Sequence, residues 1–235
     1  MISEHGAEEI KNIVLQKLND EILDPAFLLY KDAARESANF IKNHMCNALV
    51  LRGADPTWRF WPYVIDKSLL DGYFLEFGVF KGESLSFFAK QRPECIFYGF
   101  DSFEGLPEDW SGGSAPKGFF SVNDWSALPV MRLPNVKLVA GWFEDTLPQF
   151  IGGHFKKDTC CSFLHMDSNL YSSTAFVLQS LTPYIRSGTV ILFDDFFNYP
   201  GYAQHDFKAF FDVIDPIFKY EFIAFQHARA AVLIK

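Results

Sequence analysis

The sequence predicts an α/β protein with a doubly wound, mostly parallel, seven-stranded sheet, helices on both faces and a C-terminal antiparallel hairpin. From Tyr73 onward, five short apolar runs end in polar or glycine residues and alternate with helical stretches. Nearly continuous apolar runs are typical of strands that are covered on both faces. Strand and helix in regular alternation indicate a parallel sheet. Two further apolar runs close the chain, and the connection between them is too short for a helix.

The first part of the chain predicts helices. Residues 7–47 place apolar side chains at helical spacing among charges, as in "AEEIKNIVLQKL" and "AARESANFIKNHM". The aromatic stretch from Pro56 to Leu70 has no clear period. We therefore divide the chain into a helical extension, residues 1–70, and a sheet domain, residues 71–235. The extension is expected to contribute to a substrate site or to contacts in a homo-oligomer.

The elements of the sheet domain follow in order. Helices are expected at 83–91, 144–151 and 171–186, between the five strands. The last two strands should pair as an antiparallel hairpin at the edge of the sheet. The predicted strands are "YFLEFGV" (73–79), "IFYGFD" (96–101), "VKLVAG" (136–141), "CSFLHMD" (161–167), "TVILFDD" (189–195), "YEFIAFQ" (220–226) and "RAAVLIK" (229–235).

Composition excludes several classes of protein. The chain has 235 residues, of which 49% are hydrophobic and 21% charged, as expected for one globular core. A formal charge of −8 argues against nucleic acid as a partner. No apolar run is long enough for a membrane span, and the N-terminus has no signal-peptide pattern. None of the four cysteines has zinc-site spacing, which fits a cytoplasmic protein.

The first predicted strand leads into a glycine-containing turn, "LEFGVFKGES" (75–84). Gly78 and Gly82 would let a ligand lie against the backbone. The pattern lacks the first glycine of the dinucleotide fingerprint, and Glu76 would repel a pyrophosphate. A cationic nucleoside such as S-adenosylmethionine suits this turn better. The alternative is an ordinary tight turn with a solvated glutamate.

Two later strand ends extend this hypothesis. Asp101 closes the second strand, 25 residues after Glu76, where a carboxylate can accept hydrogen bonds from both ribose hydroxyls. The alternative role of Asp101 is an Asx-turn. Gly141 ends the third strand, and Trp142 or Phe143 could stack on adenine or belong to the core.

Three carboxylates follow the next two strands. Asp167 ends the fourth, and Asp194 and Asp195 end the fifth. Neighbouring strands would bring them together, and close carboxylates require a cation or retained protons. Oxygen ligands favour a hard ion, so we predict an Mg²⁺ site, with Mn²⁺ or Ca²⁺ as alternatives. Otherwise these carboxylates would cap the following helix.

Three more polar residues border this predicted site. Asn169 could offer a carbonyl oxygen to the metal or to a substrate. His165 lies on the same face of its strand as Asp167, although a histidine in an apolar strand is more often a hydrogen-bonded core residue. His205 could be a base, a substrate contact or a surface residue. Asp167 and His205 are the candidate catalytic residues, and Asp167 is the first candidate for taking a proton.

These segments resemble the macrocin O-methyltransferase family, S-adenosylmethionine-dependent enzymes with the Rossmann-like class I methyltransferase fold, many of which act on sugar hydroxyls of natural products. The similar segments lie between about residues 70 and 205: "FLEFGVFKGESLSFFA", "YGFDSFEGLPEDW", "KLVAGWFEDTLP", "LHMDSNLYSSTAFVLQSLTPYI" and "GTVILFDDFFNYPG". The resemblance implies Mg²⁺ on Asp167, Asp194 and Asp195. It implies a cofactor site at Glu76, Gly78, Gly82, Ser84, Asp101 and Ser102, to which we add Phe77, Gly141, Trp142, Phe143 and Asp167. Where the family commonly has D-x-D-x-Y, this chain has "DSNLY", and Asn169 would weaken metal binding or slow the reaction.

The predicted function is Mg²⁺-dependent O-methyl transfer to a small molecule with two neighbouring hydroxyls, such as a natural-product sugar. The loop at residues 104–126, rich in Gly, Pro and Ser, could act as a lid or be a plain surface loop. Two alternatives stay open. One is a catechol or phenol O-methyltransferase of the same fold, and the other is a non-catalytic relative that binds the nucleoside.

Overall fold

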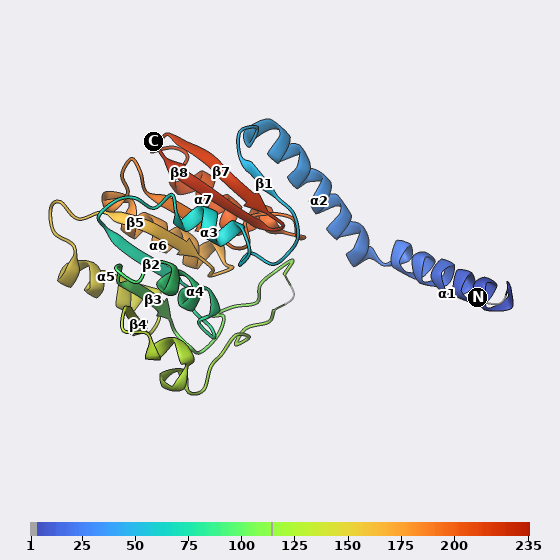
Figure 1. Cartoon of the computed structure of the whole chain (residues 1–235), viewed down its shortest axis with the longest axis horizontal. Helices are drawn as coiled ribbons and strands as arrows, with labels where there is room; N and C mark the ends of the chain where they lie inside the picture. Colours follow the sequence, from blue (N-terminus) through green and yellow to red (C-terminus); the bar gives the residue numbers. More distant parts are fainter. Residues whose placement is uncertain (1–3, 114) are drawn as a thin grey trace.

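The computed structural model of the chain describes residues 4–113 and 115–235, with no account of the side chains of residues 4, 5 and 18–23. Residues 1–3, at the start of the segment in which no signal-peptide pattern was found, and Ser114 of the predicted lid lie outside the described residues. A three-layered α/β body carries two long N-terminal helices (Figure 1).

The body is built on one sheet of eight strands in the order β1-β7-β8-β6-β5-β2-β3-β4. Among these strands only β8 runs antiparallel to its neighbours. All seven predicted strands are present with shifts of a few residues at their ends. The bounds of the eight strands are β1 (Leu49–Leu51), β2 (Tyr73–Phe77), β3 (Phe97–Asp101), β4 (Val136–Ala140), β5 (Cys161–Met166), β6 (Val190–Phe193), β7 (Tyr220–Gln226) and β8 (Arg229–Ile234), and the predicted strands correspond to β2 through β8.

The eighth strand corrects the predicted count and the predicted place of the hairpin. β1 has three residues, too few for an alternating pattern to stand out, and it pairs in parallel with β7. The predicted hairpin β7–β8 exists and is antiparallel. However, β8 also pairs with β6 and β7 is covered by β1, so the hairpin lies within the sheet. The edge position belongs to β1, which satisfies the outer hydrogen-bonding groups of β7.

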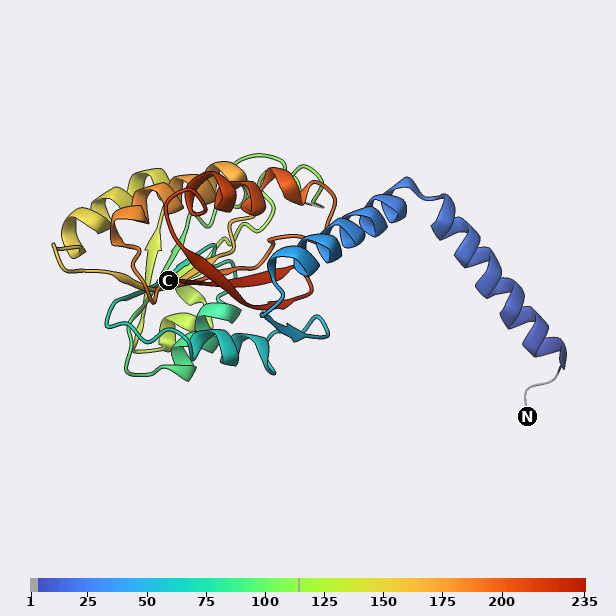
Figure 2. The ribbon, with the colours of Figure 1, turned by 90° about the horizontal axis from the view of Figure 1, so that it is seen from above.

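Helices cover both faces of the sheet (Figure 2). One face packs against α5 (Phe143–His154), α6 (Tyr171–Leu181) and α7 (Asp206–Val213), and the other against α3 (Phe60–Ile65) and α4 (Glu83–Gln91). Short 3₁₀ turns lie at η1 (Trp125–Ala127), η2 (Pro129–Arg132), η3 (Thr182–Tyr184) and η4 (Tyr202–Gln204). The predicted helices thus correspond to α4, α5 and the run from α6 through η3. Many of the 27 phenylalanines fill the two resulting core layers, which explains their number.

The N-terminal helices are α1 (Glu4–Leu23) and α2 (Pro25–His44), which project from the body in Figure 2. Asp24 separates them by capping α2 through a 2.9 Å bond from the Ala26 amide, and Pro25 starts the helix. The second half of α2 packs on the body. Ala33 and Ser37 are buried, Ser37 Oγ accepts a 2.9 Å hydrogen bond from Asn198 N, and the centroid of the Phe40 ring lies 5.0 Å from that of Phe207. β1 and α3 belong to the body, so the body begins before residue 70. The boundary predicted at residue 70 therefore lies beyond the end of the two projecting helices.

Within the described part of the chain, no helix is long and apolar enough to cross a membrane. All four cysteines are free thiols, and Cys160 and Cys161 are buried at the start of β5 as small apolar residues.

Candidate active site

The polar residues expected at one edge of the sheet do meet there. Backbone hydrogen bonds of 2.9–3.0 Å join the carboxyl ends of β4, β3, β2, β5 and β6 in that order: Gly141 N to Asp101 O, Gly78 N to Phe100 O, Asp167 N to Phe77 O and Asp194 N to Met166 O. Residues from five strand ends therefore share one rim, as parallel strands require.

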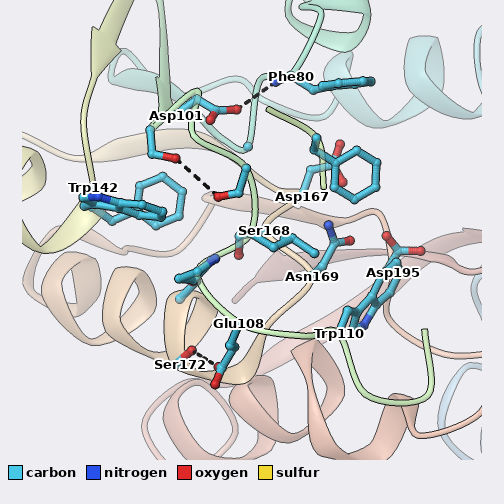
Figure 3. A pocket seen from close by; sticks show the side chains of 18 of the residues that line it. Phe80, Asp101, Glu108, Trp110, Trp142, Asp167, Ser168, Asn169, Ser172 and Asp195 are labelled. Carbon is cyan, nitrogen blue, oxygen red and sulfur yellow. Dashed lines mark hydrogen bonds between the residues drawn. The ribbon is translucent and has the colours of Figure 1, made fainter. Parts of the chain in front are cut away.

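A cavity of about 650 Å³ opens at this rim, a size that suits small molecules. Figure 3 shows that its labelled side chains form two ends. Asp101 and Trp142 lie at one end, and Asn169, Asp195 and Trp110 lie at the other. The site can therefore accommodate two ligands side by side.

The turn after β2 has the close approach that its glycine predicted. Gly78 has φ +95°, and a Cβ atom there would stand 2.0 Å from the carbonyl oxygen of Asp167. Asp101 fixes the turn because its Oδ2 accepts hydrogen bonds from the amides of Val79 and Phe80, each 2.8 Å long. Its Oδ1 accepts from Phe103 N at 2.7 Å, which is the Asx-turn of the alternative interpretation. Asp101 also lines the cavity, so one carboxylate has both the local role and access to a ligand.

The predicted cofactor residues divide into two groups. Gly78, Asp101, Ser102, Trp142, Phe143 and Asp167 line the cavity. The others support it without lining it: Phe77 is fully buried, Gly141 directly follows β4 with φ +136°, and Gly82 packs so closely that a Cβ would stand 2.7 Å from Val130 Cγ1. Glu76 and Ser84 also lie outside the lining.

Glu76 is buried, whereas the alternative interpretation of this turn expected a solvated glutamate. It is 1% exposed, and it accepts hydrogen bonds from Ser84 Oγ at 2.9 Å and from His165 Nδ1 at 2.8 Å. A buried carboxylate needs such donors. Glu76 thereby ties the start of α4 to β5, beneath the Gly78 turn.

The three carboxylates of the predicted metal site converge. One carboxylate oxygen from each of Asp167, Asp194 and Asp195 lies within 4.8 Å of the other two. Burial and the charge of Asp194 raise the pKa of Asp167 well above its usual range. The same two causes raise the pKa of Asp195 to about 7. Burial is the larger cause for both carboxyl groups, and the nearby charge of Asp194 adds to it.

Arg229, at the start of β8, is a site residue that the sequence analysis missed. Its Nε lies 2.6 Å from Asp194 Oδ1 and its Nη2 lies 3.1 Å from Asp194 Oδ2. Its Nη1 donates to the carbonyl of Ala54 at 3.1 Å. Although burial opposes it, His165 and Arg229 hold the pKa of Asp194 below its usual value. The sequence did indicate that such a residue should exist, because two adjacent buried carboxylates, Asp194 and Asp195, require a nearby cation.

His165 lies between Glu76 and the cluster of Asp167, Asp194 and Asp195. Its Nδ1 contacts Glu76, and its Nε2 lies 3.8 Å from Asp194 Oδ1, which is too long for an ordinary hydrogen bond. Burial alone would lower its pKa, but Asp194 and Glu76 raise the pKa of His165 to about 10. His165 thus lies buried between Glu76 and Asp194, and both sequence interpretations hold: it belongs to the core, and it borders the site.

The candidate base His205 does not line the cavity. The residue is 5% exposed, and its Nε2 lies 2.8 Å from the carbonyl oxygen of Ser111. Its ring also packs near Trp110, at 6.4 Å between centroids. His205 thus supports the 104–126 loop through Ser111, and its catalytic role stays a prediction.

Asn169 lines the cavity beside the carboxylates. It adopts φ +64°, a left-handed conformation that Asn tolerates better than most residues. Its neighbour Ser168 is held by Thr174, with 2.8 Å between the hydroxyls, and Thr174 donates to buried Asp206 at 2.6 Å. This chain fixes the loop that presents Asp167 and Asn169.

The 104–126 loop is folded against the body over its described residues. Backbone bonds of 2.9 Å join Leu106 N to Phe119 O and Trp110 N to Ala115 O. Leu106 packs with Leu170 and Ala115, and Trp110 and Phe120 pack against them and line the cavity. The loop therefore forms a wall of the site.

Comparisons with known proteins agree with this geometry. Residues 75–196 match the family described as "Methyltransferase domain". The "8-demethyl-8-(2,3-dimethoxy-alpha-L-rhamnosyl)-tetracenomycin-C 4'-O-methyltransferase" of Streptomyces olivaceus is 26% identical over 66% of this chain and 66% of its own. The "Demethyldecarbamoylnovobiocin O-methyltransferase" of Streptomyces niveus is 29% identical over 50% of this chain and 48% of its own. The chain thus spans about two thirds and about half of these relatives.

A solved structure supports the fold. The crystal structure of CalS11, a calicheamicin methyltransferase, superposes with a TM-score of 0.63 at 21% identity and covers 99% of this chain and 94% of that one. The fold is that of the class I methyltransferases, with β8 as the antiparallel strand. The chain belongs to the methyltransferase domain family.

Proposed function

We propose that the protein is an S-adenosylmethionine-dependent, Mg²⁺-dependent O-methyltransferase that acts on a sugar hydroxyl of a small natural product. The convergence of Asp167, Asp194 and Asp195 beside the Gly78–Asp101 end of the cavity is the observation that carries this proposal. The two curated relatives add support, because both are named as O-methyltransferases and one name specifies a rhamnosyl group.

The cofactor is assigned to the end of the cavity with Asp101 and Trp142. There S-adenosylmethionine would supply an activated methyl group. The carboxylate of Asp101 can accept from the ribose hydroxyls, and the ring of Trp142 offers a face for adenine. Because Gly78 has no Cβ, its turn can pack directly against the backbone carbonyl of Asp167, which brings the turn and Asp167 together at this end of the cavity. Glu76 supports this end of the cavity indirectly, because its hydrogen bonds to Ser84 and His165 hold α4 and β5 together.

The three carboxylates fit a divalent ion. The donor set is entirely oxygen, and the oxygens lie within 4.8 Å of one another. Arg229 and His165 lie beside Asp194, but among the described residues no basic side chain forms an ion pair with Asp167 or Asp195. Burial and the charge of Asp194 raise the pKa of both. Asp167, Asp194 and Asp195 would hold Mg²⁺, which as a Lewis acid makes a bound hydroxyl more acidic.

The remaining steps belong to the chain's own side chains. Asp167 ends a rigid buried strand and lines the cavity, so its carboxylate oxygen is our candidate for accepting the proton of the acceptor hydroxyl. Asn169 can orient the acceptor by a hydrogen bond. The wall formed by Leu106, Trp110 and Phe120 excludes water from that end of the cavity. Fixed positioning of the two ligands contributes much of the rate.

The test is methyl transfer from labelled S-adenosylmethionine to an aryl rhamnoside and to a catechol, with excess Mg²⁺ or with EDTA. We expect label in the rhamnoside, lost with EDTA and lost in Asp195→Ala, while S-adenosylhomocysteine binding changes less than about threefold. Asp158→Ala, an exposed carboxylate at the opposite end of β5, is the matched control. Label in the catechol alone would favour a phenol methyltransferase. Cofactor binding without transfer to either acceptor would favour a non-catalytic protein.

A further inference from the structure

Two phenylalanines that line the cavity have unusual backbones. Phe80 has φ +48° and Phe120 has φ +68°, in the left-handed region that bulky residues rarely adopt. Their rings meet edge to face, with 5.2 Å between the centroids and 77° between the planes. Backbone strain of this kind persists only where surrounding contacts impose it, and it is concentrated at functional sites.

Asp101 holds the backbone of Phe80 in this conformation. Its Oδ2 accepts the 2.8 Å hydrogen bond from Phe80 N, and its Oδ1 accepts the 2.7 Å bond from Phe103 N, another phenylalanine with a positive φ, +58°. The carboxylate that we assign to the ribose of the cofactor therefore also fixes the position of the Phe80 ring.

The Phe80 ring already has a cation over one face. The Nζ atom of Lys81, an exposed residue outside the cavity lining, lies 5.0 Å from the ring centroid. An aromatic face attracts a cation within about 6 Å because its π electrons are negative. The edge-to-face contact with Phe120 occupies one further face. Of the four faces of the two rings, two are thus left for a ligand.

The sulfur of S-adenosylmethionine belongs to the stretch of the cavity between Asp101 and Asp167. This sulfur is bonded to the 5′ carbon of the ribose, and its methyl group has to face an acceptor at the carboxylate cluster. In Figure 3 the side chain of Phe80 extends from its hydrogen bond with Asp101 toward the side on which Asp167 lies. The aromatic pair is therefore near the place where the cofactor carries its positive charge.

We propose that the Phe80–Phe120 pair selects the sulfonium of S-adenosylmethionine over the thioether of S-adenosylhomocysteine. This inference rests on the proposed function and adds specificity-determining residues to it. In the transfer, the acceptor oxygen forms a bond to the methyl carbon and gives its proton to Asp167. The carbon–sulfur bond breaks, and its electron pair stays on the sulfur, which becomes neutral. A ring face attracts the sulfonium but not the neutral thioether, so the pair retains the methyl donor and lets the product leave.

The experiment measures by calorimetry, with excess Mg²⁺ and no acceptor, the Kd of S-adenosylmethionine, of S-adenosylhomocysteine and of sinefungin, which carries an amine near the position of the sulfonium. The variants are Phe80→Leu, Phe120→Leu and the double Leu variant, with Phe80→Tyr and Phe120→Tyr to retain the rings. Phe87→Leu, in α4 and outside the lining of this cavity, is the matched control. Leucine is apolar but has no π face, so a purely structural role would weaken the binding of all three ligands alike.

We expect the preference for S-adenosylmethionine over S-adenosylhomocysteine, given by the ratio of their Kd values, to fall about threefold to tenfold in the double Leu variant and by less in each single one. Sinefungin should lose affinity together with S-adenosylmethionine. Both Tyr variants and Phe87→Leu should keep the preference of the wild type.

An unchanged preference in the Leu variants, or a loss for S-adenosylmethionine that sinefungin does not share, would overturn the inference. If the double variant does not fold, the single variants decide by the same ratio. If none of the three nucleosides binds to the wild type, the proposed function is what fails.

Discussion

Replacing Asp195 with Asn should stabilise the metal-free protein at mildly alkaline pH and should abolish stabilisation by Mg²⁺. Asp195 lies in the carboxylate cluster, and within the described residues no cation pairs with it directly. An asparagine has nearly the same shape but carries no charge, so the substitution removes repulsion from Asp167 and Asp194 without opening a hole.

The sign of the pH dependence follows from the raised pKa of Asp195. Its pKa is about 7 in the folded protein, compared with an ordinary value of 3.8, because of burial and the charge of Asp194. Between about pH 4 and pH 7 the folded state therefore holds a proton that the unfolded state has lost. Stability falls as the pH rises through this window, and the full penalty is present above pH 7.

The magnitude follows from the same pKa values. A difference of about three pH units corresponds to about 4 kcal/mol at about 1.36 kcal/mol per unit. The titration is shared with Asp167 and Asp194, and the cavity admits water, so we expect about half of this, about 2 kcal/mol. For a chain of this length, 2 kcal/mol corresponds to a rise in Tm of about 4–8 °C.

The assay is thermal unfolding of the wild type, Asp195→Asn and the control Asp158→Asn, near pH 5 and near pH 8, with EDTA or excess Mg²⁺. With EDTA, Asp195→Asn should exceed the wild type near pH 8 and match it more closely near pH 5. With Mg²⁺, only the wild type and the control should gain stability.

Two results would refute this reasoning. One is a lower Tm of metal-free Asp195→Asn near pH 8, which would mean that the carboxylate is a stabilising partner in the fold. The other is equal stabilisation of Asp195→Asn and the wild type by Mg²⁺, which would place any bound ion elsewhere.

Three further substitutions, the first with Gly152→Ala as its control, probe the site and the attachment of α2. Gly78→Ala should weaken S-adenosylhomocysteine binding at least about tenfold in calorimetry, since its Cβ would overlap the backbone of Asp167, directly after β5. By contrast, Gly152→Ala in α5, with open space around it, should stabilise the fold by about 0.5–1 kcal/mol. Arg229→Lys should cost about 2–4 kcal/mol in urea unfolding near pH 7, because Lys cannot reproduce the two-pronged contact with Asp194, and unchanged stability would contradict this. Phe40→Ala should cost about 2–4 kcal/mol and speed proteolysis within α2, and a cleavage pattern like that of the wild type would show that α2 is held by other contacts.

The sequence predicted the parallel strands well because each is a run of apolar residues bounded by glycine or aspartate. It missed β1 because three residues, "LVL", carry no period, and β1 is recognisable as a strand only by its pairing with β7. The hairpin itself was predictable from its short turn. Its place within the sheet was not, since strand order depends on long-range pairing.

In the candidate site, too, some residues could be predicted from local sequence and others depend on long-range packing. The carboxylates were predictable because they end adjacent strands, and parallel strands bring such ends to one rim. Arg229 was not, since its partner Asp194 lies 35 residues away. Glu76 was expected to contact the cofactor, and its pairing with His165 and Ser84 in the core emerges only when β2, β5 and α4 pack together. Local sequence patterns locate the strand ends. Whether a polar side chain there pairs within the core or contacts a ligand depends on the tertiary structure.

The central claim is that three aspartates hold a divalent ion next to the cofactor. A crystal soaked with Mn²⁺ and S-adenosylhomocysteine tests it directly through the anomalous signal of the ion. We predict one strong peak at about 2.0–2.3 Å from carboxylate oxygens of Asp167, Asp194 and Asp195, with the nucleoside over the turn at Gly78. A bound nucleoside without a peak at these carboxylates, at saturating Mn²⁺ and near pH 8, would contradict the account.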